Sequence, residues 1–286
     1  MARIVMTGTT GHVGGGAIAE LAAAGHDLCQ IVRDPARAPA IDGVETVVAP
    51  GLDDRAALRA TLRRGDRVFL VSAWTGHDER VRLHRAFIDA ASDAEVGHLV
   101  YLSFVNARPD AAFSHARSHA DTERDLRPSG LPFSILRTSY YQLNLEAFFV
   151  DGIVRGPSGR VGWVSRADCS HALAGAMAGA AEVGETYDLT GPDAPTLEES
   201  AARAGELLGT SFTYLHEEEP TDVGPDWKVG IRARGSRAIA LGELDLVGDG
   251  VRRLTGAEAE SVDTYVLANP DAFRPGAVAP ASPAAP

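Results

Sequence analysis

Short apolar runs alternate with amphipathic stretches through the first half of the chain. The runs are too short for core helices and are rich in β-branched residues, which is typical of buried parallel strands. Between them, apolar residues recur at helical spacing, as at Val13, Ala17, Ile18 and Leu21. Strands that alternate with helices predict a Rossmann-type, doubly wound parallel sheet. The expected strands are residues 4–6, 28–32, 44–48, 68–72, 98–103 and 133–136.

Beyond residue 140 this rhythm loosens, which predicts a smaller α+β lobe at the C-terminal end. We expect strands at 161–164, 185–189 and 212–215, and helices at 167–181, 196–209, 237–246 and 262–267. Asp168 is predicted to cap the first of these helices, and Thr196 with Glu199 to form a capping box. The predicted organisation is a dinucleotide-binding domain at 1–140, a substrate-binding lobe at 141–274 interleaved with the sheet, and a disordered Pro/Ala-rich tail at 275–286.

Three glycines connect the first strand to the first helix. Gly8, Gly11 and Gly14 form the pattern G-x-x-G-x-x-G. In dinucleotide-binding folds, such glycines allow a tight turn, close approach of the backbone to a pyrophosphate, and tight packing of helix on strand. The amides at the helix start, at its positive dipole end, form an anion site. The pattern predicts a nucleotide site, against the alternative of an ordinary turn between strand and helix.

The end of the second strand carries the residues that choose between the two nicotinamide coenzymes. An arginine there reads a 2′-phosphate and an acid reads a free 2′-hydroxyl. Arg33 favours NADP(H), with Arg37 as a second cation, whereas Asp34 would serve NAD(H). A solvated Arg-Asp loop without a ligand is the third possibility.

Ligands of open parallel sheets bind outside the carboxyl ends of the strands, so the loops that follow the strands should line one crevice. Ser103 ends the fifth strand, where it is either a hydrogen-bond donor to a substrate carbonyl or a turn residue. The residues that this rule places near one ligand are Thr9, Arg33, Ser72, Ala73, Ser103, Thr138, Tyr140 and Tyr141.

His115 and His119 lie four residues apart, on one face of a predicted helix. One interpretation puts the imidazoles beside the nicotinamide, as proton donor or coenzyme contact. A metal pair with Glu123 is a second interpretation, which a dinucleotide fold does not require. The third is a solvated helix face.

Charge and composition exclude several classes of protein. The net charge of -12 argues against a nucleic-acid or anionic membrane surface. No apolar run approaches the roughly 20 residues that a spanning helix needs. Only Met1, Ala2 and Arg3 precede the first strand, so we expect no signal peptide. Because two cysteines also suggest a reducing compartment, we expect a cytoplasmic protein.

The chain resembles the atypical short-chain dehydrogenases/reductases of the NmrA-like group, and within it the NAD(P)H:quinone oxidoreductase type 2 relatives. The resemblance spans about residues 2–273. It rests on the motifs at 7–14, 32–35, 99–103, 119–123, 130–137, 187–192 and 254–256.

The resemblance implies an NADPH site, with NADH as the other possible coenzyme, and a cleft roofed by the C-terminal lobe. His119 occupies the position where the family replaces the usual superfamily lysine, and Tyr141 and Asn144 match residues that face the substrate. The implied coenzyme-binding residues are Gly8, Thr9, Thr10, Gly11, His12, Val13, Arg33, Ser72, Ala73, Ser103 and His119. His119, Ser103 and Tyr141 are the candidate catalytic residues, and Tyr140, Tyr141 and Asn144 the candidate substrate contacts, with no metal.

Two departures from the family pattern bear on function. Relatives have a Gly-Asp pair before the helix near Asp53, and its acid contacts the adenine. This chain has Pro50-Gly51 in place of that pair. The superfamily Tyr-x-x-x-Lys is absent, because the sequence contains a single lysine, Lys228. Quinone reduction tolerates this loss, since hydride addition gives an aromatic hydroquinone anion that needs only a modest proton donor.

The leading hypothesis is therefore an NADPH-dependent oxidoreductase that transfers hydride to a quinone or an activated enone or ketone, in small-molecule biosynthesis. The alternative is a regulatory protein that senses NADP(H) without turnover. We expect a small-molecule substrate, no nucleic-acid or membrane partner, and a second copy of the chain as a candidate partner.

Overall fold

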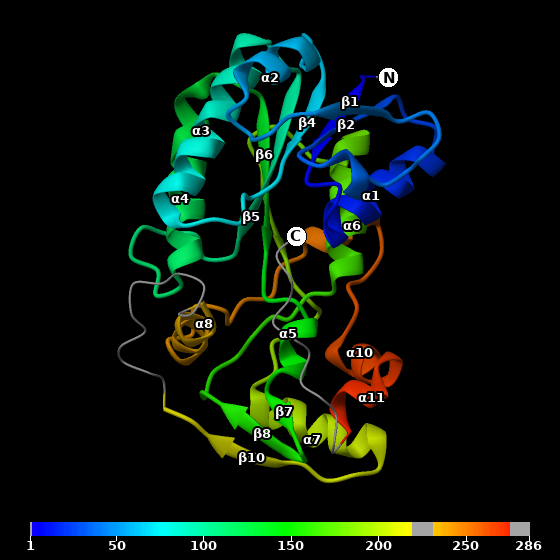
Figure 1. Ribbon diagram of the computed structural model, residues 1–286. Helices are drawn as coiled ribbons and strands as arrows, with labels where there is room; N and C mark the ends of the chain where they lie inside the picture. Colours follow the sequence, from blue (N-terminus) through cyan, green and yellow to red (C-terminus); the bar gives the residue numbers. More distant parts are fainter. Residues whose placement is uncertain (1, 219–230, 275–286) are drawn as a thin grey trace.

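A seven-stranded parallel sheet is the frame of the molecule in the computed structural model, which describes residues 2–218 and 231–274 (Figure 1). Its strands are β1 (Ile4–Thr7), β2 (Leu28–Val32), β3 (Glu45–Val48), β4 (Arg67–Leu70), β5 (His98–Phe104), β6 (Phe133–Thr138) and β9 (Thr186–Leu189). Their order is β3-β2-β1-β4-β5-β6-β9, so the sheet grows in one direction from β1 and then in the other from β4. β1 and β5 are buried at every residue, because helices cover both faces. The predicted Rossmann-type fold is confirmed.

Two groups of helices sandwich this sheet (Figure 1). One face carries α1 (His12–Ala23) and α6 (Arg166–Gly175), which pack together, and α9 (Gly250–Thr255) beside α6. The other face carries α2 (Arg55–Thr61), α3 (His77–Asp93) and α4 (Ser114–Leu126). The apolar stripe predicted for the first helix is buried at all four of its positions. Each face therefore has its own hydrophobic layer, and the carboxyl ends of the strands remain as the place where loops meet.

The remaining elements form a lobe below the carboxyl edge of the sheet (Figure 1). Its small sheet has the order β10-β8-β7, with β7 (Phe149–Val150) antiparallel and β10 (Thr213–His216) parallel to β8 (Ile153–Gly156). The helices of this part are α5 (Leu143–Glu146), α7 (Leu197–Leu208), α8 (Ile231–Ala240), α10 (Val262–Ala268) and α11 (Pro270–Phe273). Its core is aromatic, and includes the fully buried indole of Trp163.

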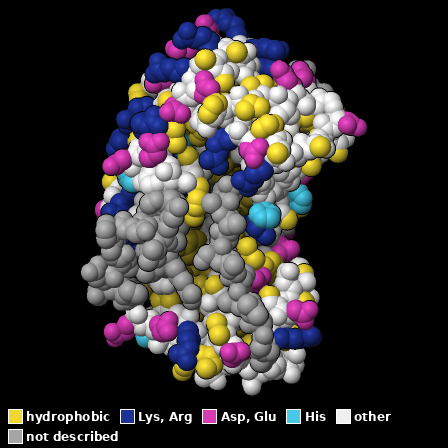
Figure 2. All heavy atoms as spheres, viewed as in Figure 1, with side chains coloured by type: hydrophobic (Ala, Val, Ile, Leu, Met, Phe, Trp, Pro, Cys, Tyr) yellow, Lys and Arg dark blue, Asp and Glu magenta, His cyan; other side chains and the backbone are white. Residues whose placement is uncertain are grey.

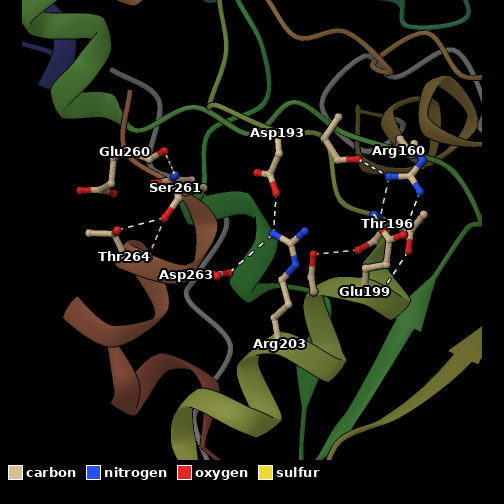
Figure 3. A network of polar contacts seen from close by, with 12 residues as sticks. Arg160, Asp193, Thr196, Glu199, Arg203, Glu260, Ser261, Asp263 and Thr264 are labelled. Atoms are coloured by element: carbon tan, nitrogen blue, oxygen red, sulfur yellow. Dashed lines mark hydrogen bonds and ion pairs between the residues drawn. The ribbon is translucent and has the colours of Figure 1, made fainter. Parts of the chain in front are cut away.

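Polar contacts tie α7 to the loops around it (Figure 3). Arg203 donates to Asp193 and lies 3.7 Å from Asp263, which links α7 to the start of α10. The predicted capping box is present, since Thr196 and Glu199 exchange hydrogen bonds of 3.0 Å.

The helix expected at 167–181 is shorter than predicted and has a different cap. Ser165 caps α6 by accepting from the amide of Asp168, whereas the Asp168 carboxylate accepts from the amide of Glu260. The prediction that Asp168 is the cap is wrong, because a distant loop uses that carboxylate. After Gly175 the chain continues as a π-helical turn, Ala176–Ala180.

Two further predictions in the lobe need correction. The strand expected at 161–164 makes a single bridge, between Val164 and Tyr141, because Gly162 is packed against loop backbone and bonds to the carbonyl of Leu244. The strand β8 forms instead in a stretch that the sequence analysis left unassigned. The helix expected at 237–246 is α8, which ends before the left-handed turn at Gly242.

The division of the chain into two domains stays a proposal, and the structure adds one fact to it. After residue 140 the chain returns to the large sheet, because β9 is one of its strands and α6 packs against α1 and β9. The tail 275–286 and Lys228 lie outside the described residues. Among the residues that are described, no helix combines the length and apolar character needed to span a bilayer.

Candidate functional site

The turn between β1 and α1 can be made only with glycine at two of its positions. Gly8 has a φ of +69°, and a Cβ there would lie 2.6 Å from the side chain of Val71. A Cβ on Gly14 would lie 2.4 Å from the carbonyl oxygen of Gly8. The turn therefore presses against Val71, just after β4, and against the first turn of α1, and it presents bare main chain at the sheet edge.

The start of α1 has the features that a phosphate group requires. Its N-cap is Gly11, and no side chain caps the helix, so the first amides of His12 and Val13 are left for a ligand. The hydroxyl of Thr9 donates to Gln30 over 2.8 Å, toward β2. Thr9 therefore offers a ligand its backbone, while its side chain holds the turn in place. This arrangement fits a dinucleotide pyrophosphate.

At the end of β2, the neighbouring side chains of Arg33 and Asp34 have different surroundings. Asp34 accepts from the amide of Ala36 over 3.0 Å and caps the short helix η1 (Pro35–Arg37). Arg33 is exposed at the sheet edge. One carboxylate oxygen of Asp34 is thus used within the loop, which favours Arg33 as the residue that meets a ribose phosphate.

The loop after β4 is fixed by a buried histidine of α3. The amide of Ala73 donates to Nε2 of His84 over 2.9 Å, and Nδ1 of His84 lies 2.9 Å from Oγ1 of Thr122. An amide nitrogen can only donate, so Nε2 is unprotonated and Nδ1 carries the hydrogen. Ala73 and its neighbour Ser72, both predicted to line the coenzyme, are thereby joined to α3 and α4.

His119 lies in a buried polar cluster beneath the same edge. It is 6% exposed, and its Nδ1 lies 2.8 Å from the hydroxyl of Tyr101. Burial lowers the pKa of His119 well below its usual range, and the positive charge of Arg80 lowers it further. Burial likewise lowers the pKa of His84 and of His115 to about 3. These imidazoles are therefore neutral near neutral pH.

Ser103 is committed to a neighbour within the protein. Its hydroxyl donates to Glu123 over 2.6 Å, and Glu123 holds the guanidinium of Arg137 through bonds of 2.9 and 2.6 Å. The hydroxyl oxygen of Ser103 keeps its acceptor capacity, so the role predicted for it as a donor to substrate stays a prediction. Glu123 is equally committed, and the described residues contain no group of three His, Cys, Asp or Glu side chains that could hold a metal ion.

Aromatic rings adjoin this cluster. Phe104, Phe113 and Tyr140 pack with ring centroids 5.0 to 5.6 Å apart, and Phe104 stacks on His119 at 6.4 Å. Trp163 continues the cluster at 6.2 Å from Tyr140. We call Phe104, Phe113, Tyr140 and Trp163 the aromatic cluster.

The two neighbouring tyrosines that the sequence analysis treated alike lie in different surroundings. Tyr140 belongs to the aromatic cluster, whereas Tyr141 packs against the hydrophobic layer of α1 and α6. The backbone amide of Asn144 donates to the carbonyl of Tyr141 over 2.8 Å. Phe104 thus contacts both Tyr140 and His119, while Tyr141 belongs to another layer.

The sequence analysis did not identify several residues of this site. Tyr101 and Phe104 are contributed by β5, Arg80 and His84 by α3, and Phe113 by the loop that leads to α4. Of these, Phe104 had a usable signal, because it directly follows Ser103 at the end of a predicted strand. On the face shown in Figure 2, hydrophobic side chains line a hollow between the sheet and the lobe.

Comparison with known proteins agrees with this geometry. A family described as NAD(P)H-binding matches residues 8–179. The chain is 31% identical over 226 residues to quinone oxidoreductase 2 of Escherichia coli K12, which covers 76% of this chain and 78% of that protein. It is also 31% identical over 270 residues, 91% of this chain and 90% of the relative, to (4-alkanoyl-5-oxo-2,5-dihydrofuran-3-yl)methyl phosphate reductase of Streptomyces griseus.

A solved structure is similar along almost its whole length. The NADPH complex of the Escherichia coli NADPH-dependent quinone oxidoreductase superposes with a TM-score of 0.81 at 28% identity, and the match covers 92% of this chain and 98% of that one.

The glycine turn gives a test of coenzyme binding. In Gly14→Ala the new methyl group would collide with the carbonyl of Gly8, so we expect NADPH to bind on the order of tenfold more weakly in calorimetry. Gly184→Ala is the control, because a Cβ there meets open space away from the turn, although its φ of +87° will also strain the fold. Equal losses of NADPH affinity in the two variants would contradict the assignment of the glycine turn to coenzyme binding.

The buried imidazoles give a test of stability against pH. Because the pKa of His84 is lowered to about 3, the unfolded chain takes up a proton that the folded chain does not, and stability is lost as the pH falls below about 6.5. The contribution is at most about 1.4 kcal/mol per pH unit for one histidine. Urea unfolding between about pH 7 and pH 5 should show a smaller slope in His84→Gln, with His171→Gln as the control. An unchanged slope in His84→Gln would show that this imidazole is not held neutral.

Proposed function

We propose that this chain, which belongs to the NAD(P)H-binding family as an atypical short-chain dehydrogenase/reductase of the NmrA-like group, is an NADPH-dependent reductase of quinones or similarly activated enones and ketones. The observation that carries the proposal is the neutral imidazole of His119 beside the aromatic cluster, at the sheet edge where the glycine turn exposes bare main chain. When bound, the nicotinamide supplies a hydride.

The residues of the site suit a planar, electron-poor acceptor. The rings of Phe104 and Tyr140 lie 5.6 Å apart, and in the proposed complex an aromatic or quinonoid ring would pack beside them. Hydride addition to a quinone leaves negative charge on an oxygen, and one proton completes the hydroquinone. A neutral imidazole is a weak acid, so His119 would stabilise that oxygen as a hydrogen-bond donor while the proton comes from water.

The buried guanidinium of Arg80 supports this chemistry. It is 2% exposed, and it donates to Ser118 over 3.2 Å. Burial lowers the pKa of Arg80 to about 10, which leaves it charged at neutral pH. A fixed positive charge of this kind favours an anionic product over a neutral acceptor.

The relatives support the acceptor class by their names, which are those of a quinone oxidoreductase and of a reductase of an oxo-dihydrofuran. Tyr140 is our first substrate contact, with Asn144 and Tyr141 as further candidates. We further propose that the protein is cytoplasmic, that it acts in small-molecule biosynthesis and that it pairs with a second copy of the chain.

A coenzyme oxidation assay tests the proposed reaction. We expect the purified protein to oxidise NADPH in the presence of a benzoquinone or naphthoquinone, more slowly with a cyclic enone, and not with an unactivated aliphatic ketone. NADPH absorbance is followed against a blank without acceptor. Calorimetric binding of NADPH without oxidation by any acceptor would reject the reductase and favour the NADP(H) sensor, for which the missing Tyr-x-x-x-Lys also argues.

The choice of coenzyme rests on Arg33. Because charge-assisted hydrogen bonds to a phosphate contribute about 1.5–3 kcal/mol, Arg33→Ala should raise the KM for NADPH by roughly 10-fold or more and change that for NADH little. Arg155→Ala removes an exposed arginine from the lobe, and should leave both values unchanged. Equal effects of Arg33→Ala on the two coenzymes would show that this side chain does not read the 2′-phosphate.

A further inference from the structure

Tyr101 is a tyrosine whose environment leaves its side chain little freedom. It lies in the middle of β5 and is 0% exposed. The ring of His84 packs edge-on against it at 5.5 Å, and the ring of His119 lies at 5.8 Å in a tilted orientation. The hydroxyl therefore has a fixed position, 2.8 Å from Nδ1 of His119.

The direction of this hydrogen bond follows from the chemistry of the two groups. Burial raises the pKa of the Tyr101 phenol above its usual value, so the hydroxyl keeps its proton. A phenol is a stronger donor than a neutral imidazole N–H, and an imidazole nitrogen is a stronger acceptor than a phenol oxygen. The favoured arrangement is therefore a bond from the hydroxyl of Tyr101 to an unprotonated Nδ1 of His119.

We propose that Tyr101 is a positioning residue that fixes His119 as the tautomer with its hydrogen on Nε2. Nδ1 is occupied by Tyr101, so Nε2 is the nitrogen left to meet a bound acceptor. The hydrogen of the imidazole is then available as a donor to the oxygen that gains charge. This inference rests on the proposed function for the identity of that oxygen, but the tautomer itself is a property of the protein alone.

His84 provides an internal reference, because it holds the other tautomer. Its Nε2 accepts from the amide of Ala73, so its hydrogen lies on Nδ1. Its partner Thr122 donates in turn to the carbonyl of Ser118 over 3.0 Å, which is consistent with a hydroxyl oxygen that accepts from His84. Two buried histidines on neighbouring helices thus hold opposite tautomers, each selected by a neighbour on its other nitrogen.

Nitrogen NMR of the full-length protein with labelled histidine tests the inference directly. Long-range proton–nitrogen correlations distinguish the two tautomers, and the variants His119→Gln and His84→Gln assign the two signals. We expect an Nε2–H tautomer for His119 and an Nδ1–H tautomer for His84. An Nδ1–H tautomer for His119 in the wild-type protein would overturn the proposal, whatever the activity.

Tyr101→Phe then tests the cause. Loss of the hydroxyl should give His119 a mixture of tautomers and lower kcat for quinone roughly tenfold, as expected for one lost hydrogen bond, with the KM for NADPH unchanged. Tyr214→Phe is the matched control, because it also removes a hydrogen-bonded hydroxyl, 3.1 Å from the carbonyl of Gly156 in the lobe. An unchanged His119 tautomer in Tyr101→Phe would overturn the proposal.

The tautomer of His119 and the proposed reaction are tested separately. If the wild-type protein reduces no quinone and yet His119 is the Nε2–H tautomer, the positioning by Tyr101 stands and the proposed reaction falls. If Tyr101→Phe does not fold, the wild-type spectrum alone decides the tautomer.

Discussion

The buried charge of Arg80 sets the chemical character of the whole site. Within the described part of the chain, no carboxylate lies within ion-pair distance of this guanidinium, which contacts the hydroxyl of Ser118. Its charge adds to burial in lowering the pKa of His84, His115 and His119. A second positive charge close to a buried guanidinium is energetically costly. The imidazoles therefore remain neutral and act through hydrogen bonds.

The glycine turn and the buried cluster around His119 both rely on groups whose charge does not change. At the glycine turn, the proposed contacts to the coenzyme come from backbone amides and a helix dipole. In the proposed reaction, the buried cluster would act on the acceptor through a neutral imidazole and the charge of a fixed guanidinium. Neither half needs a side chain to change its charge during the reaction, which suits an acceptor that becomes aromatic when it is reduced. The hydroxyls of Thr9 and Ser103 both donate within the protein, to Gln30 and to Glu123.

The sheet, the glycine turn and the family were predictable because their signals are local. Each buried strand is a short apolar run, and the three glycines follow one another within seven residues. The cluster around Tyr101 was not predictable, since it joins β5 to α3 and α4 through pairs separated by 18 to 38 residues. For the same reason the sequence could not reveal that Tyr140 and Tyr141 enter different hydrophobic layers, or that a distant loop takes the carboxylate of Asp168. Such outcomes depend on which distant residues pack together, and the spacing of residues along the chain does not give that information.

The return of the chain to the large sheet after the lobe has a consequence for how the protein can be divided. Strand β9 pairs with β6 as the last strand on that side of the sheet, and α6 packs on α1. A fragment that stopped at residue 140 would leave β6 with an open edge and α1 with a bare apolar surface, both of which invite aggregation. Residues before and after position 140 contribute to one hydrophobic core, so we expect the two parts of the chain to fold only together.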